Sequence, residues 1–151
     1  MLLYRITKAL YADKLVASGI ENRWNAQGKF VIYAASAASL ACLENLVHTS
    51  GKLLYTTQYR LVVIEVPDKA SRTIIELTDL PSDWRQLSHK QATQAIGNRW
   101  YDERATLLLD IPSAIIPIEK NFIINTAHID FRKVRILRSE PFLFDIRLKL
   151  P

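Results

Sequence analysis

Apolar residues occur along the chain mainly in short runs whose length and composition are typical of β-strands. The runs at 59–66 (YRLVVIEV) and 106–111 (TLLLDI) are directly followed by Pro67 and Pro112, and proline cannot donate to a strand ladder. The apolar run FVIYAA at 30–35 is too short for a helix and predicts a buried strand. The complete set of predicted strands is 2–6, 30–35, 59–66, 73–77, 106–111, 121–125, 134–137 and 142–148.

Helical periodicity is clearest just after the strand at 30–35. Leu40, Leu43 and Val47 recur at helical spacing, and Ser36 precedes them as a predicted N-cap. Strands outnumber helices, and the tight βαβ alternation of a parallel sheet is absent, so the pattern predicts an α+β fold of mainly antiparallel sheets with flanking helices. The predicted helices are 37–48 and 88–104, with a weaker one at 13–18.

Composition limits the chain to one domain and one broad class of protein. With 151 residues and 49% hydrophobic content, a single domain over 1–151 is expected. The longest uncharged run, 30–43, falls short of a membrane span, and the N-terminus lacks a signal-peptide layout. The single cysteine, Cys42, lies in apolar surroundings and is expected to pack rather than react. We therefore expect a cytoplasmic protein with no membrane association.

The net charge of +5 is concentrated near the C-terminus. From Arg132 onward there are six basic residues and two acidic ones. Such a segment fits an anionic partner, and it fits a solvated face of terminal strands equally well. A non-catalytic basic protein that binds nucleic acid or a partner is therefore one function class to weigh. Phe131, Phe142 and Phe144 are too few and too apolar in context for a base-stacking platform, so direct nucleic-acid binding is not expected.

Common metal and nucleotide motifs are missing from the sequence. The three histidines, His48, His89 and His128, are far apart, and no HExxH or CxxC spacing occurs. The four glycines form neither a Walker loop nor a GxGxxG fingerprint. We expect no metal and no resident cofactor, and a bound nucleotide would have to be held in another way.

Glu44 is the most unusual residue of the predicted helix at 37–48. It lies four residues after Leu40 and three before Val47, which places it on the shoulder of the apolar stripe. A carboxylate there must keep contact with water or find donors, because unpaired burial costs several kcal/mol. One explanation is a functional carboxylate, and the other is a helix glutamate that reaches solvent or pairs with His48 one turn later.

Three further side chains in or beside predicted strands have suitable chemistry for a ligand. Arg23, in a loop with Trp24 and Asn25, offers a planar fork for phosphate or carboxylate. Tyr33 points to the same side of its strand as Val31 and offers a flat face. Ser113, after Pro112, either faces a cleft or bonds its own backbone in a turn. A loop salt bridge for Arg23 and a core position for Tyr33 are the corresponding structural alternatives.

These residues stand in a series of motifs that resembles the RES family of toxins, named after an Arg, a Glu and a Ser. The family pattern is LYRI, GxRWN, xxLYxA, SxxxAxLE, VH, VPS and NxxxNPxH. In this sequence the matching segments are LLYRI at 2–6, NRWN at 22–25, VIYAA at 31–35, SLACLENLVH at 39–48, LLLDIPSAIIP at 107–117 and NFIINTAH at 121–128. Several motifs match in order and spacing from residue 2 to about 131, so the resemblance covers nearly the whole chain.

The resemblance implies an ADP-ribosyltransferase-like fold and an enzyme that cleaves the nicotinamide–ribose bond of NAD+, with NAD+ as a substrate and not a cofactor. Glu44 would stabilise positive charge on the ribose, Arg23 would clamp the pyrophosphate, Tyr33 would stack on the nicotinamide, and Ser113 would hydrogen-bond near Glu44 or the ribose. Hydrolysis, phosphorolysis and transfer of ADP-ribose to a protein all remain open. Second-rank residues for shaping the pocket are Trp24, Asn25 and Asn125.

The resemblance also implies a partner. RES toxins are paired with a helix-turn-helix antitoxin of the Xre type, which is expected to cover the cleft, with the basic C-terminal segment around Arg135 and Arg138 as its docking surface. A homodimer is a further assembly that the resemblance allows. Three departures from the family pattern affect loop shape and not the reactive side chains: Glu21, Ala26 and Thr126.

Overall fold

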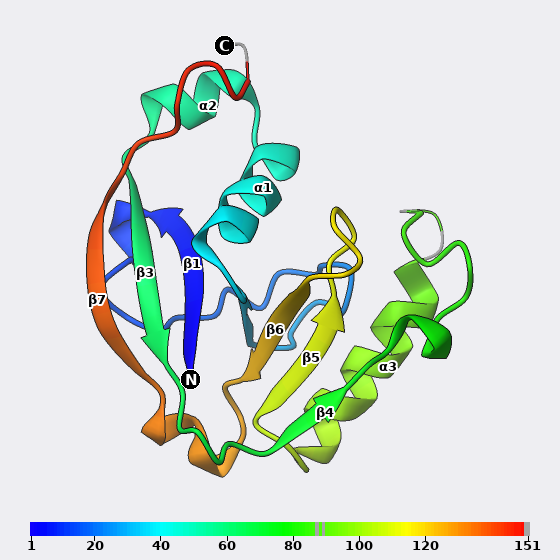
Figure 1. The fold of residues 1–151 in the computed structure, drawn as a ribbon. Coiled ribbons are helices and arrows are strands. Elements are labelled where there is room, and N and C mark those ends of the chain that lie inside the picture. Colours follow the sequence, from blue (N-terminus) through cyan, green and yellow to red (C-terminus); the bar gives the residue numbers. More distant parts are fainter. Residues whose placement is uncertain (87, 89, 150–151) are drawn as a thin grey trace.

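Most of the chain forms one strongly curved β-sheet with helices on its outer face (Figure 1). The computed structural model describes residues 1–86, 88 and 90–149. Within these residues the strand order is β4-β5-β6-β2-β1-β3-β7, antiparallel except for the parallel pair β4 and β5. The strands are β1 (Leu2–Lys8), β2 (Val31–Ala35), β3 (Tyr59–Glu65), β4 (Arg72–Ile74), β5 (Leu108–Pro112), β6 (Lys120–Asn125) and β7 (Arg135–Phe142).

Three α-helices and several 3-10 turns complete the described structure. The helices are α1 (Ala38–His48), α2 (Gly51–Thr56) and α3 (Lys90–Glu103), and the 3-10 turns include η1 (Ala9–Tyr11), η2 (Leu77–Asp79) and η4 (Ile129–Lys133). In the part of the chain that is described, no helix is both long and apolar enough to span a membrane. The predicted α+β architecture with mainly antiparallel strands is therefore confirmed.

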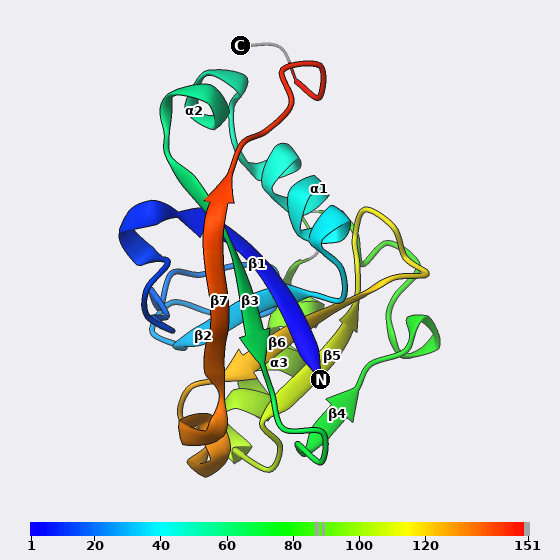
Figure 2. The same cartoon turned by 60° about the vertical axis from the view of Figure 1, so that its left-hand side comes forward.

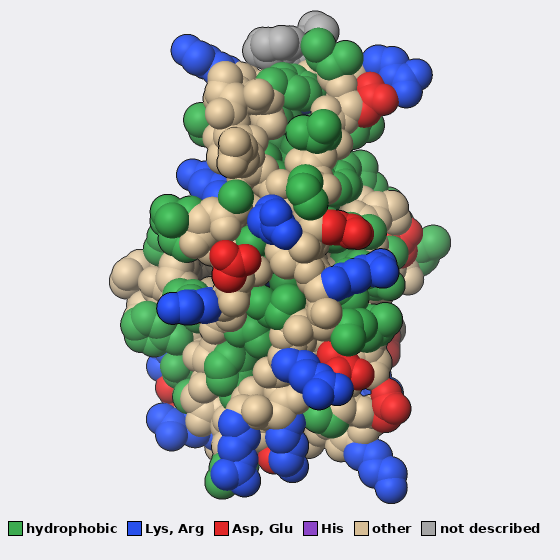
Figure 3. Space-filling view, turned by 90° about the vertical axis from the view of Figure 1, so that its left-hand side faces the viewer, with side chains coloured by type: hydrophobic (Ala, Val, Ile, Leu, Met, Phe, Trp, Pro, Cys, Tyr) green, Lys and Arg blue, Asp and Glu red, His purple; other side chains and the backbone are tan. Residues whose placement is uncertain are grey.

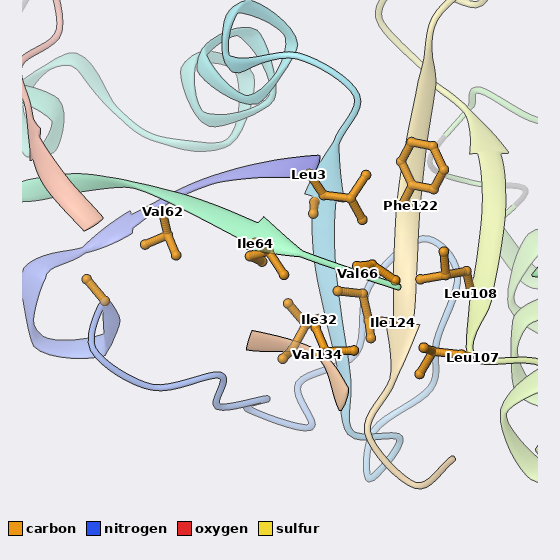
Figure 4. Close-up of a cluster of buried hydrophobic side chains, with 12 residues drawn as sticks. Leu3, Ile32, Val62, Ile64, Val66, Leu107, Leu108, Phe122, Ile124 and Val134 are labelled. Atoms are coloured by element: carbon orange, nitrogen blue, oxygen red, sulfur yellow. The ribbon is translucent and has the colours of Figure 1, made fainter. Parts of the chain in front are cut away.

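The sheet is divided into two halves at the contact between β1 and β2. These strands share a single paired position, Tyr4 opposite Ala35, whereas β1 and β3 pair along their whole length. Inner-face residues of both halves, such as Ile64 on β3 and Ile124 on β6, belong to one buried cluster (Figure 4). Burial of apolar surface between the halves, worth about 25 cal/mol per Å², is what holds the sharply bent sheet together.

The outer face of the sheet carries two separate helical caps. Trp100 of α3 packs with outer residues of β5 and β6, and Leu40 of α1 packs with outer residues of β1 and β3. Val31, Tyr33 and Ala35 alternate onto this face of β2, with Tyr33 against the α3 cluster and Ala35 in the α1 cluster. The outer face of β2 therefore passes from one cap to the other between Tyr33 and Ala35. Figure 2 shows the two caps, α1 and α3, at separate places on the molecule.

The strands predicted at 2–6, 30–35, 59–66 and 121–125 are confirmed to within a few residues at their ends. The run 106–111 forms β5, which begins at Leu108 and includes Pro112 opposite Lys120. The run at 73–77 yields only the short strand β4. The residues 134–137 form the start of β7, which continues to Phe142. The prediction of a strand at 142–148 is wrong, because the chain turns after Phe142, where Phe144 packs edge-on against Tyr59.

The helical predictions differ from the structure in four respects. Residues 13–18 are not helical, because Leu15 and Ala17 pack on the inner cluster at alternating positions, which requires extended backbone. The N-cap of α1 is Ala37, without a side-chain cap, and not Ser36. The helix α2 was not predicted; the Ser50 side chain caps it by accepting from the Leu53 amide. The predicted helix at 88–104 begins at Lys90, and residues 87 and 89 lie outside the described residues.

Candidate active site

The carboxylate of Glu44, on α1, is held by two side chains from the β5–β6 half of the sheet. Its Oε1 atom accepts hydrogen bonds from Ser113 Oγ at 3.0 Å and from Asn121 Nδ2 at 2.5 Å. The other oxygen, Oε2, lies 3.9 Å from Nε2 of His48, whose side chain is 66% exposed. The Glu44 side chain is 25% exposed. One oxygen is therefore fixed by two donors, and the second lies towards the exposed His48 side chain, so the predicted pairing with His48 describes part of the geometry and the functional role stays a prediction.

Ser113 stands at the start of the loop between β5 and β6, which lies beside α1 (Figure 1). The residue is fully buried. Its hydroxyl donates to Glu44 and accepts from the backbone amides of Ile115 and Ile116, each at 3.1 Å. Because both amides can only donate, they direct the Ser113 proton towards the carboxylate. Ser113 thus bonds its own turn, as one of the two alternatives expected, and its hydroxyl also contacts the Glu44 carboxylate, while its catalytic role stays a prediction.

Asn121 is the site residue that the sequence analysis missed. It begins the outer face of β6, opposite Ala35 of β2 and Ile111 of β5, and is 9% exposed. The motif NFIIN has an asparagine at each end, and the sequence pattern alone favoured only the second one, Asn125, as a pocket residue. The choice between the two ends of a strand depends on which end meets Glu44, and that contact spans 77 residues of sequence.

Arg23 reaches the site from the loop before β2. Its Nη1 donates to the backbone oxygen of Trp84 at 2.9 Å, and its Cζ lies 5.8 Å from the centre of the Trp84 ring. Burial holds the pKa of Arg23 below its ordinary value, and the nearby carboxylate of Glu44 partly offsets this effect. Among the described residues Arg23 has no ion pair, so its predicted loop salt bridge is absent there. The remaining guanidinium donors are available for an anion.

The loop that carries Arg23 is anchored on α3. Thr93 of α3 donates its hydroxyl proton to the Arg23 backbone oxygen at 2.7 Å. Gly97 sits so close to the Trp24 backbone that a Cβ atom there would lie 1.8 Å from the Trp24 oxygen. Because only glycine permits this approach, the backbone of α3 sets the height of the loop above the sheet.

Tyr33 is largely buried and donates its hydroxyl proton to Asn25 Oδ1 at 2.7 Å. Burial raises the pKa of the Tyr33 phenol far above its usual value, so the group stays neutral and keeps its proton for donation. Asn25 in turn donates from Nδ2 to the backbone oxygens of Ile20 at 2.8 Å and Ala26 at 3.1 Å. The Arg23 loop and Tyr33 are therefore coupled through one asparagine.

Three second-rank candidates have structural positions and do not face a ligand beside Glu44. Trp24 is 2% exposed and packs against Trp84, with ring centres 6.2 Å apart. The amide of Asn25 is occupied as described above. Asn125 is fully buried, donates to the Tyr101 backbone oxygen at 3.0 Å and accepts from the Ala127 amide at 2.9 Å. It ends β6, about 13 Å along the strand from Asn121, and its side-chain amide bonds the backbone of the turn after β6 and of α3.

Most of the basic C-terminal side chains are engaged within the chain itself. Arg135 pairs with Glu65 at 2.5 Å, Lys133 with Asp130 at 2.8 Å and Arg147 with Asp145 at 2.7 Å. Lys149 donates to the backbone oxygens of residues 46 and 49 at the end of α1. On the face that carries β7, basic side chains are dispersed among acidic and apolar ones (Figure 3). This mixture does not form the continuous basic stripe that a phosphate backbone favours.

Two surface depressions are formed by the described residues. One, of about 410 Å³, lies between the start of β1 and the η4–β7 segment, far from Glu44, and is lined by Met1, Glu65, Val66, Pro67, Asp68, Arg132, Lys133 and Arg135. The other, of about 360 Å³, adjoins Ser113 and is lined by Ser82, Asp83, Arg85, Gln86 and Ala114. Neither lining includes Glu44, Ser113 or Asn121, and the smaller depression approaches this cluster through Ala114, the residue that follows Ser113. Within the described part of the chain, no three metal-binding side chains gather at one point.

Comparison with known proteins finds a family model and relatives that are named as toxins. The family model described as RES domain matches residues 2–145. The Prs ADP-ribosylating toxin of Sphingobium sp. (strain YBL2) is 37% identical over 142 residues, which cover 91% of this chain and 88% of the relative. Toxin Res of Photorhabdus laumondii subsp. laumondii is 34% identical over 153 residues, with 98% and 97% covered.

One solved structure has a similar fold. A chain in the crystal structure of the M. tuberculosis MbcT–MbcA toxin–antitoxin complex matches with a TM-score of 0.77 and 20% sequence identity, covering 94% of this chain and 84% of that one. At this identity the likeness concerns the fold alone. The arrangement of the curved sheet and its helices is therefore shared with a protein of known structure.

Proposed function

Because the chain belongs to the RES domain family, we propose that it is a toxin enzyme that cleaves the nicotinamide–ribose bond of NAD+. Its relatives are named as toxins, and one is named as an ADP-ribosylating toxin. ADP-ribosylation consumes NAD+, so that name supports NAD+ as the substrate here. The observation that carries the proposal is the carboxylate of Glu44, fixed through one oxygen and accessible through the other.

The chemistry needs few protein groups. Breaking the bond between ribose and nicotinamide passes through an oxocarbenium-like state. The nicotinamide ring is cationic before cleavage and leaves neutral, so no general acid is required. Glu44 Oε2 would stabilise the positive charge on the ribose by accepting from a ribose hydroxyl, while Oε1 stays bonded to Ser113 and Asn121. Preorganised charge of this kind is commonly the largest contribution to catalysis.

Arg23 and Tyr33 would orient the dinucleotide around this carboxylate. Arg23 has free guanidinium donors for the pyrophosphate, and its backbone is anchored to α3 through Thr93. Tyr33 would place its ring against the nicotinamide, and its hydroxyl is held by Asn25. Loss of either contact is expected to misplace the substrate, because displacement by about 1 Å can cost a hundredfold in rate.

Three different acceptors of ADP-ribose are compatible with this proposal, and each gives a different product. Water would give free ADP-ribose, inorganic phosphate would give a phosphorylated ADP-ribose, and a protein side chain would give a modified protein. Transfer to a protein is the second candidate, favoured by the name of the Sphingobium relative. All three acceptors would attack the same ribose carbon after nicotinamide has left, so the same residues serve each outcome.

The test is to incubate the purified protein with NAD+, with and without phosphate, and to identify the products. We expect free nicotinamide from the wild type and a loss of at least about a hundredfold for Glu44→Gln, which corresponds to about 2.7 kcal/mol of lost charge stabilisation. Glu103→Gln, an exposed glutamate at the end of α3, is the matched control. Nicotinamide release by Glu44→Gln at the wild-type rate would contradict the proposal.

An antitoxin partner is also proposed, because the solved structure of similar fold belongs to a toxin–antitoxin complex. Arg138 on β7 is exposed and has no ion-pair partner among the described residues, whereas Arg135 is paired with Glu65. Charge reversal at Arg138 is therefore the cleaner test of the basic docking surface. Arg138→Glu should weaken binding of the antitoxin encoded with this chain, measured by calorimetry, and unchanged affinity would exclude that surface. Self-association stays a prediction that sedimentation can measure.

A non-catalytic basic protein is the rival of another class. It would bind nucleic acid with a steep dependence on salt concentration, and Glu44→Gln would not alter that binding. The internal pairing of Lys133, Arg135 and Arg147 reduces the charge that such binding could use. We therefore place this function second.

A further inference from the structure

The depression of about 360 Å³ beside Ser113 has no role in the cleavage chemistry proposed above. Its lining residue Ala114 directly follows Ser113, the donor to Glu44. The volume falls within the range of about 300 to 1,000 Å³ that small-molecule sites commonly have. The depression is thus large enough for a nucleoside, and one of its lining residues is the chain neighbour of the donor to Glu44.

The segment that lines the depression also holds Arg23. Trp84 lies between the lining residues Asp83 and Arg85. Its backbone oxygen accepts from Arg23 Nη1 at 2.9 Å. The carboxylate charge of Glu44 also acts on the Arg23 guanidinium and raises its pKa. Arg23 is therefore linked to the reacting carboxylate by charge and to the segment that lines the depression by a hydrogen bond.

We propose that this depression binds the adenosine end of NAD+, an inference that rests on the proposed function. NAD+ has the nicotinamide riboside at one end, the pyrophosphate in the middle and adenosine at the other end. With the nicotinamide ribose at Glu44 and the pyrophosphate at Arg23, the adenosine continues past Arg23. The depression along the 82–86 segment is the site on that side.

The lining side chains have the chemistry that adenosine needs. Arg85 and Gln86 are exposed, and neither side chain has a hydrogen-bond or ion-pair partner in the described part of the chain. The Arg85 guanidinium can pair with the phosphate nearest adenosine or stack on the adenine ring. The Gln86 amide offers one acceptor and two donors to the base or the ribose, and Ser82 adds a hydroxyl. The rim thus supplies contacts without using the residues around Glu44.

The experiment compares NAD+ with nicotinamide mononucleotide, which has the same scissile bond but lacks the adenosine half. Arg85→Glu should raise the KM for NAD+ at least about tenfold, through lost contacts and repulsion of phosphate. Gln86→Ala should raise it less. Neither change should alter nicotinamide release from the mononucleotide by more than about twofold. Arg99→Glu, at a 75% exposed position on α3, is the control and should change neither substrate.

Equal effects of Arg85→Glu on both substrates, or no effect on either, would overturn the adenosine assignment. If the wild type releases nicotinamide from neither substrate, the proposed function itself fails. Titration of ADP-ribose by calorimetry then decides the subsite independently of turnover. Binding weakened about tenfold by Arg85→Glu supports the assignment, and binding that is absent or unaffected by this change refutes it.

Discussion

Replacement of Asn121 by alanine tests how the Glu44 carboxylate is held. In the wild type one carboxylate oxygen accepts from both Asn121 Nδ2 and Ser113 Oγ, at 2.5 Å and 3.0 Å. Asn121→Ala removes the shorter bond and leaves the second donor in place. Asn121 is 9% exposed, so water has little access to replace the lost donor. The carboxylate is then free to rotate away from the orientation in which Oε2 meets the ribose.

The size of the effect follows from the kind of bond. A hydrogen bond to a charged group contributes about 1.5–3 kcal/mol, which corresponds to a factor of roughly 10 to 150 in rate. Asn121 touches the carboxylate and not the dinucleotide in our proposal. We therefore expect kcat to fall by about that factor while KM for NAD+ changes by less than about threefold.

The assay is release of nicotinamide from NAD+, with kcat and KM determined separately. Loss of a group that only orients the carboxylate should lower kcat and leave KM nearly unchanged. Asn125→Ala, at the other end of β6, is the control: it removes a buried turn contact and should lower the melting temperature without a comparable fall in kcat. An unchanged kcat in Asn121→Ala would refute the reasoning.

Three further changes test other parts of the structure. Ser113→Ala removes the second donor to the catalytic carboxylate and leaves two backbone amides unpaired, so kcat should fall by about tenfold or more and the melting temperature should drop. Gly97→Ala places a methyl group 1.8 Å from the Trp24 backbone oxygen and should cost at least about 3 kcal/mol in urea unfolding. Burial raises the pKa of Asp110 against the smaller effect of Arg72, and one Asp110 oxygen has no hydrogen-bond partner among the described residues. A raised folded-state pKa stabilises the fold at low pH, and this contribution is lost as pH rises past the ordinary Asp value of about 3.9. Asp110→Asn should therefore unfold at a higher temperature than the wild type at neutral pH; a lower melting temperature would contradict this.

Local sequence was sufficient to predict the strands and the faces of the sheet. The side-chain period of two along 30–35 separates Ile32 and Ala34 from Tyr33 and Ala35, and the structure buries the two sets in different clusters. Where the prediction of an extended strand failed, at 142–148, the side chains pack individually against α2 and β3 rather than in a ladder. Periodicity describes a regular element, and it has no information on a segment whose contacts are irregular.

The candidate site was predicted from the order of motifs, and the structure decided how its members meet. Arg23, Tyr33, Glu44 and Ser113 come from four separate motifs, and the structure joins Glu44 to Ser113 directly. It also corrected the choice between Asn125 and Asn121, because only the start of β6 reaches α1.

The sequence by itself determined which residues are apolar, which face of each strand they occupy and which family motifs the chain carries. Only the tertiary structure decided that Glu44 is bound through one oxygen, that Trp84 holds Arg23 and that a depression lies beyond it. These contacts join residues 61 to 77 positions apart. Their partners are selected by the bend between the two halves of the sheet, and that bend results from burial of the whole inner cluster rather than from any local pattern.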